Sequence, residues 1–274
     1  MSHSLVLQHP DIASYTLGGL PATTPYAPGI VRIAVEPDYT LPDPIAAELT
    51  RQQIDFGIVP DMPFNELGLI VSDMDSTLIT IECIDEIAAG VGLKDQVAEI
   101  TESSMRGELD FEQSLRRRVA LLKGLEEGVF QEVYDHVLQF SPGAEYLIEE
   151  CKKNQVKFML VSGGFTFFTD RLKNRLGLDY SYANTLEIVN GKLTGRLQGR
   201  IIDAQAKASL LAEYREKLGL RKEQVLAMGD GANDIPMLQE AGIGIAYRAK
   251  PKTQQNARLC INHCGLEAVR GWFL

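Results

Sequence analysis

The chain has 274 residues and a formal net charge of −10 at pH 7, with 45% hydrophobic and 23% charged residues. This composition is ordinary for a globular protein and excludes a mainly disordered or collagen-like chain. The acidic excess argues against nucleic-acid binding, which needs a basic surface. Four cysteines are too few for a disulfide scaffold, no apolar run approaches the ~20 residues of a membrane span, and residues 1–11 lack a secretory pattern. We therefore expect a cytoplasmic protein without membrane or nucleic-acid partners.

The first part of the sequence reads as a small α+β unit. Nine of the twelve prolines lie before residue 64, which predicts a domain boundary near residue 65. Residues 30–35 and 55–59 have the pattern of strands, and residues 44–53 that of a short helix. Because about 65 residues is marginal for an independent core, we expect residues 1–66 to lean on the rest of the chain or on a partner.

From residue 67 the pattern changes to strands that alternate with helices. The apolar run 67–72 indicates a buried strand, and the helical stretch 83–139 is punctuated by glycines, which predicts several short helices. Such alternation predicts an α/β fold with a mostly parallel sheet, helices on both faces, and a ligand site beyond the carboxyl ends of the strands. The remaining predicted elements are helix 144–154, strand 156–161, helix 166–176, a hairpin of 186–189 and 192–197 around Asn190-Gly191, helix 204–218, strand 225–228, helix 234–241, strands 244–247 and 259–262, and helix 266–272.

Acidic side chains follow two of the predicted strands. Asp73 and Asp75 come directly after strand 67–72, and Asp230 and Asp234 follow strand 225–228. Carboxylates at the end of an apolar strand are costly unless a cation pairs with them, and no basic residue lies between positions 51 and 94. Oxygen ligands beside glycines suit Mg²⁺. The sequence therefore predicts either a metal or a distant basic side chain at this place.

Two further segments offer groups that bind anions. Ser162-Gly163-Gly164 follows strand 156–161 and precedes a helix, so a hydroxyl and free backbone N–H groups are available there. Lys207 lies near the start of helix 204–218 and could reach a phosphate as a point charge. Neither a P-loop nor a dinucleotide-binding glycine motif occurs in the sequence.

Taken together and in this order, the motifs resemble those of the haloacid dehalogenase-like phosphohydrolases. Glu82, the segment 105–118 and the sequence 161–165 make the chain similar, within that superfamily, to the phosphoserine phosphatases. The resemblance covers about residues 67–274. It implies a Rossmann-like three-layer sandwich with a mostly parallel sheet and a helical cap inserted at about 83–140. Some members carry an amino-acid-sensing (ACT-like) domain before this core, which is one interpretation of residues 1–66.

The resemblance also implies a mechanism. The reaction would be the Mg²⁺-dependent hydrolysis of O-phospho-L-serine to L-serine and phosphate, the last step of serine biosynthesis. Asp73 would be the nucleophile that forms an aspartyl-phosphate, and Asp75 would protonate the leaving oxygen and then activate water. Asp73, the backbone carbonyl of Asp75, and Asp230 would hold Mg²⁺.

For the substrate, the resemblance implies two sets of contacts. Ser162, Gly163 and Lys207 would bind the phosphate oxygens, with Asn233 and Asp234 supporting them. At the amino-acid end, Glu82 would bind the ammonium, Arg118 the carboxylate, and Met105 and Phe111 would form an apolar lid.

Several alternatives stay open at this level. The substrate could be another small phosphomonoester such as phosphohomoserine, and the chain could instead be a regulatory amino-acid-binding protein. Residues 1–66 would then serve as a sensor or as a surface for forming a homodimer. A neighbouring arginine could replace Arg118, and Met105 and Phe111 could be plain core residues of the cap. His263-Cys264-x₅-Arg270 has the spacing of a cysteine-dependent phosphatase loop, and Cys260-x₃-Cys264 that of half a metal site.

Overall fold

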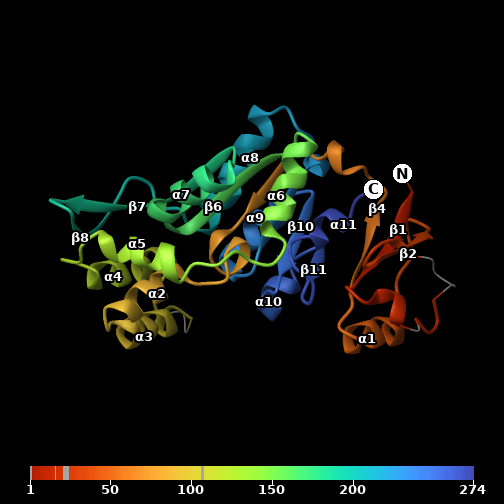
Figure 1. The fold of residues 1–274 in the computed structure, drawn as a ribbon, viewed down its shortest axis with the longest axis horizontal. Coiled ribbons are helices and arrows are strands. Elements are labelled where there is room, and N and C mark those ends of the chain that lie inside the picture. Colours follow the sequence, from red (N-terminus) through yellow and green to blue (C-terminus); the bar gives the residue numbers. More distant parts are fainter. Residues whose placement is uncertain (1, 16, 21–24, 106–107) are drawn as a thin grey trace.

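Two β-sheets organise the chain, and different parts of the sequence form them (Figure 1). The computed structural model describes residues 2–15, 17–20, 25–105 and 108–274, without the side chains of residues 104 and 105. Among the described residues, no helix is both long and apolar enough to cross a lipid bilayer.

The larger sheet is parallel except at one edge. Only its last pair of strands is antiparallel, and that pair is the hairpin predicted around Asn190-Gly191. Every other pairing in this sheet is parallel. The mostly parallel sheet expected from the sequence is therefore confirmed. Its strands, in spatial order, are β11 (Leu259–Ile261), β10 (Ile243–Tyr247), β9 (Val225–Gly229), β5 (Leu69–Ser72), β6 (Lys157–Phe165), β7 (Tyr180–Val189) and β8 (Lys192–Gln198).

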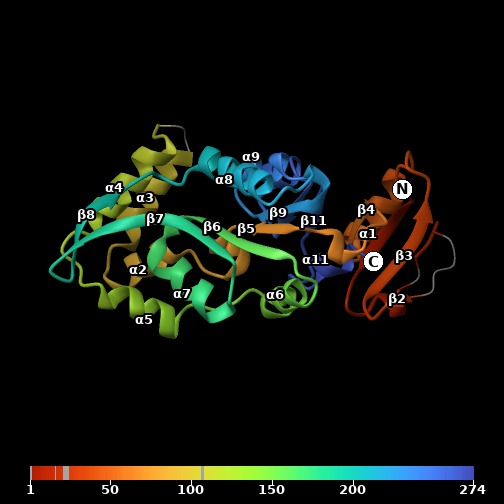
Figure 2. The same ribbon diagram turned by 90° about the horizontal axis from the view of Figure 1, so that it is seen from above.

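Helices cover both faces of this sheet, because successive side chains of a strand point to opposite faces. Leu69 and Val71 of β5 pack with α8 (Ala204–Lys217) and α9 (Ile235–Glu240), whereas Ile70 packs into the cluster that includes α6 (Ala144–Lys153) and α7 (Thr166–Leu176). Figure 2 shows these two pairs of helices on opposite sides of the sheet. The expected three-layer sandwich is confirmed. Two short helices complete this region, α10 (Pro251–Gln254) and α11 (Ala268–Gly271).

Between β5 and α6, the described part of the chain forms four α-helices. They are α2 (Cys83–Gly90), α3 (Lys94–Met105), α4 (Phe111–Leu121) and α5 (Gly128–His136), and we refer to them as the cap. The cap shares the hydrophobic core of the sheet, because the ring of Phe130 lies 6.2 Å from that of Phe165 and 6.0 Å from that of Phe168. The loop between α4 and α5 of the cap also contacts the hairpin, because the N–H of Leu193 in β8 donates to the carbonyl of Leu125 at 2.9 Å.

The smaller sheet is antiparallel. Its strands, in spatial order, are β2 (Pro25–Ala27), β3 (Ile30–Val35), β1 (His3–Gln8) and β4 (Asp55–Pro60), with helix α1 (Asp43–Arg51) between β3 and β4 in the chain. The predicted strands near 30–35 and 55–59 and the predicted helix are present, whereas β1 and β2 were not predicted. Five of the six residues of β1 are buried, so β1 lacks the apolar–polar alternation by which half-buried strands are recognised.

The two faces of the smaller sheet have different partners. Leu5 and Leu7 pack with Leu49 of α1 in a separate small core. Val6 and Val59 instead join the main hydrophobic core of the chain. This arrangement confirms the small α+β unit. The face of its sheet that carries Val6 and Val59 packs against the remainder of the chain. The exact division at residue 66 and the bounds of the cap at 83–140 stay predictions.

Asp55 at the start of β4 makes the most concentrated polar contact between the two sheets. Its Oδ1 accepts from the N–H of Asn262 at 2.7 Å, and its Oδ2 accepts from the N–H groups of His263 at 3.1 Å and Cys264 at 2.8 Å. Asp55 is 3% exposed. Both carboxylate oxygens are thus saturated by backbone donors of the loop after β11, which fixes the smaller sheet to that loop.

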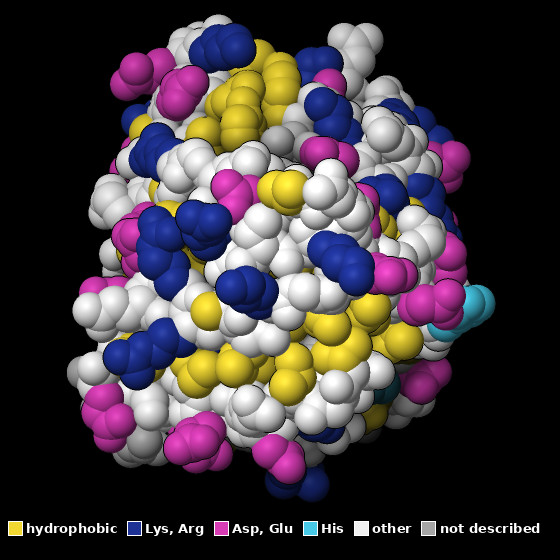
Figure 3. Space-filling view, turned by 90° about the vertical axis from the view of Figure 1, so that its left-hand side faces the viewer, with side chains coloured by type: hydrophobic (Ala, Val, Ile, Leu, Met, Phe, Trp, Pro, Cys, Tyr) yellow, Lys and Arg dark blue, Asp and Glu magenta, His cyan; other side chains and the backbone are white. Residues whose placement is uncertain are grey.

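The end of the molecule farthest from the smaller sheet is formed by β8 and the cap. Figure 3 views this end and shows basic side chains gathered across its middle and a band of apolar side chains below them. Of the large apolar side chains that are exposed, Ile188 and Val189 lie at the end of β7, next to the free edge of the sheet. The homodimer left open by the sequence stays a prediction.

The substitution Asp55→Ala should lower the free energy of unfolding by ~3 kcal/mol, because buried N–H groups that donated to a charged acceptor are left without a partner. Urea unfolding followed by circular dichroism measures this loss. Asp55→Asn keeps one acceptor oxygen and should lose about half as much. A loss below ~1 kcal/mol in Asp55→Ala would contradict the role given to this contact.

Candidate active site

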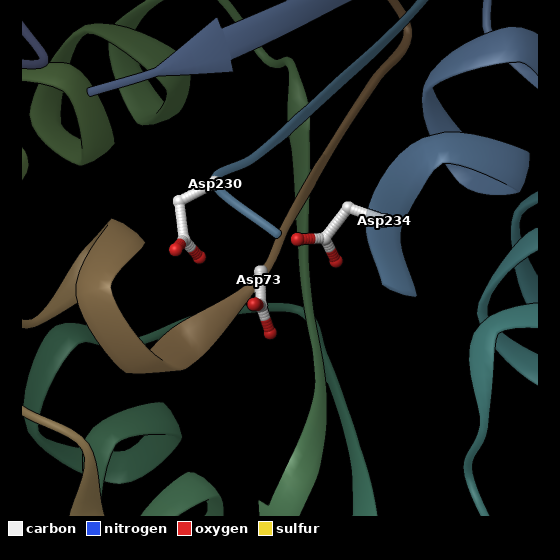
Figure 4. A group of neighbouring side chains, drawn as sticks. All are labelled: Asp73, Asp230 and Asp234. Carbon is white, nitrogen blue, oxygen red and sulfur yellow. The ribbon is translucent and has the colours of Figure 1, made fainter. Parts of the chain in front are cut away.

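Carboxylates from two neighbouring strands meet at the carboxyl edge of the larger sheet. Asp73 directly follows β5, and its N–H donates to the carbonyl of Met228 in β9 at 3.0 Å. Asp230 follows β9, and Asp234 lies in the turn before α9. Each of the three carboxylates offers an oxygen within 4.8 Å of the others. Figure 4 shows the side chains of Asp73, Asp230 and Asp234 gathered around a common space.

Lys207 is buried beside these carboxylates. Helix α8 begins after Asp203, whose side chain accepts from the N–H of Ala206 at 2.8 Å. Lys207 lies in the first turn and is 1% exposed. Its Nζ donates to Oδ1 of Asp73 at 2.7 Å and to Oδ1 of Asp234 at 2.8 Å. A buried ammonium is stable only when its donors are paired, and here two of its three hydrogens have carboxylate partners.

The charges of this cluster do not balance. Burial raises the pKa of Asp73, and the Asp234 carboxylate raises it further against the opposing effect of Lys207. Burial, with Asp234 second, raises the pKa of Asp230 to about 6. Burial alone would lower the pKa of Lys207, but the Asp234 and Asp73 carboxylates outweigh it and raise that pKa. Three carboxylates share one ammonium, and hard oxygen donors of this kind fit a divalent cation. The cluster is consistent with a metal site.

The carboxylate of Asp75 lies outside that cluster and faces a different set of donors. Its Oδ1 accepts from the N–H of Cys83 at 2.8 Å, and its Oδ2 accepts from Oγ of Ser162 at 3.3 Å. A tight turn at Met74–Leu78, in which Ser76 has φ 54°, follows Asp73 directly. Burial raises the pKa of Asp75, although the Cys83 N–H opposes this. A half-buried carboxyl of this kind can carry a proton toward a reacting oxygen.

The Ser162-Gly163-Gly164 segment forms the neighbouring wall. Ser162 is fully buried, and its Oγ accepts from the N–H of Gly164 at 2.8 Å. A Cβ on Gly164 would stand 2.9 Å from Oδ2 of Asp75, and one on Gly163 would stand 3.2 Å from the ring of Phe111. A larger residue at either position would therefore displace a side chain, Asp75 at position 164 or Phe111 at position 163, because the backbone approaches both closely.

A cleft of about 720 Å³ separates these strand ends from the cap. Asp73, Asp75 and Asp230 line its floor, and Gly163 and Gly164 line one side. The cap contributes Glu82, Phe111 and Arg118. Asn233 also lines the cleft. Ser162 and Lys207 are buried beneath the residues that line it. The structure thus brings together the predicted site residues except Met105, whose side chain lies outside the described residues.

Charged groups of both signs line the cleft from the cap side. Oε1 of Glu82, the residue before α2, accepts from Oγ of Ser76 at 2.6 Å. The side chain of Glu82 meets solvent in the cleft, but the protein surrounds it on its other sides, and this desolvation, with the Asp75 carboxylate second, raises its pKa to about 7. Burial lowers the pKa of Arg118, whose Nε is buried without a hydrogen-bond partner among the described residues. A guanidinium stays protonated at neutral pH, so the cap side offers one basic group, Arg118, beside two acids, Glu82 and Asp85.

Among the residues that line the cleft without having been predicted, Lys250, Lys252 and Thr253 come from one segment of the chain. The two lysines are exposed, and the N–H of Lys250 donates to the backbone carbonyl of Asp230 at 3.1 Å. They follow β10, which is the parallel neighbour of β9. The sequence could have pointed to these residues, because the predicted strand 244–247 ends at the same edge of the sheet as the acidic motifs.

The alternative cysteine chemistry is not supported by the structure. Burial raises the pKa of Cys264 to about 12, and its thiol donates to the carbonyl of Gln8 at 3.5 Å. In the loop after Cys264, which would form the phosphate cradle, the N–H of Gly265 donates to Oε1 of Glu267 at 2.9 Å and that of Leu266 to the carbonyl of Pro142 at 2.7 Å, so these donors already have partners. Cys260 and Cys264 are free thiols, and the group found among the described side chains that could hold a metal ion is the carboxylate cluster.

The comparisons with known proteins agree with this geometry. The family model of the haloacid dehalogenase-like hydrolases matches residues 70–239, the span that carries Asp73, Lys207 and Asp234. Because this match covers more than half of the chain, the chain belongs to the haloacid dehalogenase-like hydrolases.

More similar relatives narrow the class. The phosphoserine phosphatase of Polaromonas sp. (strain JS666) is 50% identical over 215 residues, which are 77% of this chain and 91% of that protein. The crystal structure of a haloacid dehalogenase family hydrolase from Salmonella enterica serovar Typhi aligns with 99% of this chain and 98% of its own, at a TM-score of 0.88 and 36% identity. A structure described as a phospho-aspartyl intermediate analogue of phosphoserine phosphatase covers 76% of this chain and 99% of its own, at a TM-score of 0.71 and 40% identity. The chain belongs to the phosphoserine phosphatases of the haloacid dehalogenase-like family.

A divalent cation should raise the melting temperature of the protein in a concentration-dependent way, because it binds the folded carboxylate cluster and not the unfolded chain. Differential scanning fluorimetry with MgCl₂, MnCl₂ and EDTA measures this shift. Asp230→Asn should abolish the shift without lowering the melting temperature in EDTA, because it also removes a repelling charge. Asp85→Asn, a change in an acid of the same cleft outside the cluster, should keep the shift. An equal shift in wild type and Asp230→Asn would contradict a metal site at the cluster.

Proposed function

We propose that this chain hydrolyses O-phospho-L-serine to L-serine and inorganic phosphate. The observation that carries the proposal is a cleft with two chemically different walls. Asp73, Asp230 and the buried Lys207 lie at the strand ends, and a carboxylate and a guanidinium, Glu82 and Arg118, lie on the cap. A phosphate monoester of an amino acid needs this division, because its phosphate, ammonium and carboxylate require different partners. The identity to phosphoserine phosphatases supports the same substrate.

Asp73 is the proposed nucleophile. One of its oxygens attacks phosphorus, an O–P bond to Asp73 forms, and the bond from phosphorus to the serine oxygen breaks. The proton of the Asp75 carboxyl passes to that serine oxygen, which leaves as the hydroxyl of L-serine. The raised pKa of Asp75 fits this role, because the group must hold a proton before the first step.

Water then hydrolyses the aspartyl-phosphate. The carboxylate of Asp75 takes a proton from the water as its oxygen bonds to phosphorus, and the bond to Asp73 breaks to release phosphate. Both steps use the same two residues in reversed roles. The similarity to a structure described as a phospho-aspartyl intermediate analogue supports this sequence of events.

Mg²⁺ is the proposed cofactor, and Asp73, the backbone carbonyl of Asp75, and Asp230 would hold it. When bound, it neutralises charge between a nucleophilic carboxylate and an anionic phosphate. Asp234 is a supporting residue in this proposal, because its Oδ1 accepts from Lys207 and its Oδ2 accepts from the N–H of Gly231 at 3.0 Å.

The remaining phosphate oxygens would bind to the hydroxyl of Ser162, the backbone N–H of Gly163, and Lys207, with Asn233 beside them. The ammonium of the substrate would bind to Glu82 and its carboxylate to Arg118, with Phe111 as an apolar lid. The predicted contribution of Met105 to that lid stays a prediction. Lys250 and Lys252 at the rim of the cleft would favour the approach of an anion to an otherwise acidic site.

Residues 1–66 are proposed as a unit that completes the fold of the catalytic part, because one face of the smaller sheet shares the main core. A separate amino-acid-sensing role stays a prediction. Calorimetry of the Asp73→Asn variant with L-serine, in the presence of saturating O-phospho-L-serine to fill both ends of the cleft, tests it. L-serine binding that persists under these conditions would favour a sensor.

Asp73→Asn should lower kcat on O-phosphoserine by ~10⁴-fold or more, because the amide has the same shape and no nucleophilic oxygen. Phosphate release measures the rate, and circular dichroism confirms the fold. Cys264→Ser is the matched control and should retain the wild-type rate. Activity of Asp73→Asn within ~10-fold of wild type would overturn the mechanism.

Arg118→Ala should lower kcat/KM for O-phosphoserine by ~10²-fold, because the substrate carboxylate loses a charged partner in a buried cleft. The same variant should change kcat/KM for p-nitrophenyl phosphate by less than ~3-fold, since that substrate has no carboxylate. Arg117→Ala, a neighbouring exposed arginine of α4, is the control and should affect neither substrate. Equal losses on both substrates would count against a carboxylate-binding role for Arg118.

A further inference from the structure

The ladder between β6 and β7 opens at the segment that carries Ser162. Val161 of β6 pairs with Tyr182 of β7, and the next pair is Phe165 with Asn184. Three residues of β6 therefore stand opposite one residue of β7, at position 183. Such a bulge frees the backbone of residues 162–164 from the ladder, so their peptide groups take partners other than β7. The same bulge leaves the Gly163 carbonyl without its strand partner.

Asn184 supplies the missing partner with its side chain. It is fully buried, its Nδ2 donates to the carbonyl of Gly163 at 2.8 Å, and its Oδ1 accepts from the N–H of Ile202 at 2.8 Å. A buried amide is costly unless both ends are paired. Here both ends are paired with backbone, so the side chain ties two separate segments together at a fixed distance.

The first tie reaches the groups proposed to bind phosphate and to transfer the proton. A peptide group is planar, so fixing the carbonyl of Gly163 also fixes the direction of the N–H of Gly164. That N–H donates to Oγ of Ser162 at 2.8 Å, and Oγ in turn donates to Oδ2 of Asp75 at 3.3 Å. The position of the Asn184 side chain therefore affects the position of the Asp75 carboxyl through one peptide group and one hydroxyl group.

The second tie reaches Lys207. Ile202 precedes Asp203, which caps α8, and the N–H of Lys207 donates to the carbonyl of Asp203 at 3.0 Å. The start of α8 is thus one continuous structure from the Asn184 contact to the buried ammonium. Both ends of the Asn184 amide are occupied by backbone groups, so it acts through these segments and touches no substrate.

We propose that Asn184 is a positioning residue for phosphoryl transfer. It holds the Ser162-Gly163-Gly164 segment and the start of α8 in one frame, so that the serine hydroxyl, the backbone N–H groups and Lys207 keep the spacing that three phosphate oxygens require. The inference rests on the proposed function, because it assigns those groups to the phosphate. Asn184 supports only the groups that bind phosphate, so its effect on the rate does not depend on the alcohol to which the phosphate is esterified.

Asn184→Asp and Asn184→Ala test the proposal. The aspartate keeps the size of the side chain and the acceptor for Ile202 but loses the donor to Gly163. We expect kcat to fall by ~10²-fold in the aspartate variant, the loss that misplacement of reacting groups by about 1 Å produces. The fall should be equal on O-phosphoserine and p-nitrophenyl phosphate, and inorganic phosphate should inhibit more weakly.

Asn154→Ala is the matched control. The Nδ2 of Asn154 donates to the carbonyl of Glu150 at 2.9 Å, at the end of α6, so this change also removes an amide-to-backbone bond. It should leave kcat on both substrates unchanged. If folded Asn184→Asp keeps kcat within ~3-fold of wild type, or loses rate on O-phosphoserine alone, the proposal is overturned.

The wild-type chain provides a second measurement that does not depend on how the variants fold. Hydrogen exchange should show the amides of Ile202 and Gly164 as protected as those of the β6 ladder; fast exchange at Ile202 would overturn the proposal. If wild type cleaves p-nitrophenyl phosphate but not O-phosphoserine, the proposed substrate fails while the comparison of Asn184 variants on the aryl phosphate still decides the positioning role.

Discussion

The buried ammonium of Lys207 between Asp73 and Asp234 is the interaction on which the arrangement of the site depends. Parallel strands that end at one edge deliver their next residues to the same place, and here those residues are acids. Without Lys207, three carboxylates would face one another in a buried space, which low dielectric makes strongly unfavourable. The lysine reaches them from α8, so this helix is bound to the ends of β5 and β9 by charge as well as by apolar packing.

The same charge imbalance divides the cleft into two regions. On the sheet side, acids outnumber the one buried ammonium, so the site retains capacity for a further cation. On the cap side, Arg118 of α4 provides a positive charge beside two acids, Glu82 and Asp85, at the start of α2. Because the cap shares the core through Phe130 and is hydrogen-bonded to the hairpin, these groups are held opposite the strand ends. The two regions differ because residues of α2 and α4 line one side of the cleft and residues that follow β5 and β9 line the other.

Much of this arrangement could be predicted from the sequence. Apolar runs followed at once by acids located β5 and β9, and the order of the motifs placed Asp75, Ser162 and Lys207 in one site. What could not be predicted depends on contacts far apart in the chain. Asn184 lies two residues before the predicted strand 186–189, and its role appears only when the β6 bulge leaves the Gly163 carbonyl beside it. β1 was missed because a strand buried on both faces has no alternation, and the partner of Asp55 lies more than two hundred residues away.

Asp55 and Asp230 show how a structural carboxylate differs from one with spare binding capacity. Both are acids in largely buried surroundings at the boundary of a strand. Asp55 accepts short hydrogen bonds from three successive backbone N–H groups, so its negative charge is already stabilised where it lies. Asp230 accepts only one long bond, from the hydroxyl of Thr77 at 3.4 Å, among the described side chains. Two repelling neighbours, Asp73 and Asp234, lie within reach of it. Asp230 has no comparable set of backbone donors, and a divalent cation bound at the cluster would supply the stabilisation that Asp55 gains from its own chain. For that reason the acid cluster, and not the buried cysteine loop beside Asp55, has the capacity to bind a cation and a phosphate.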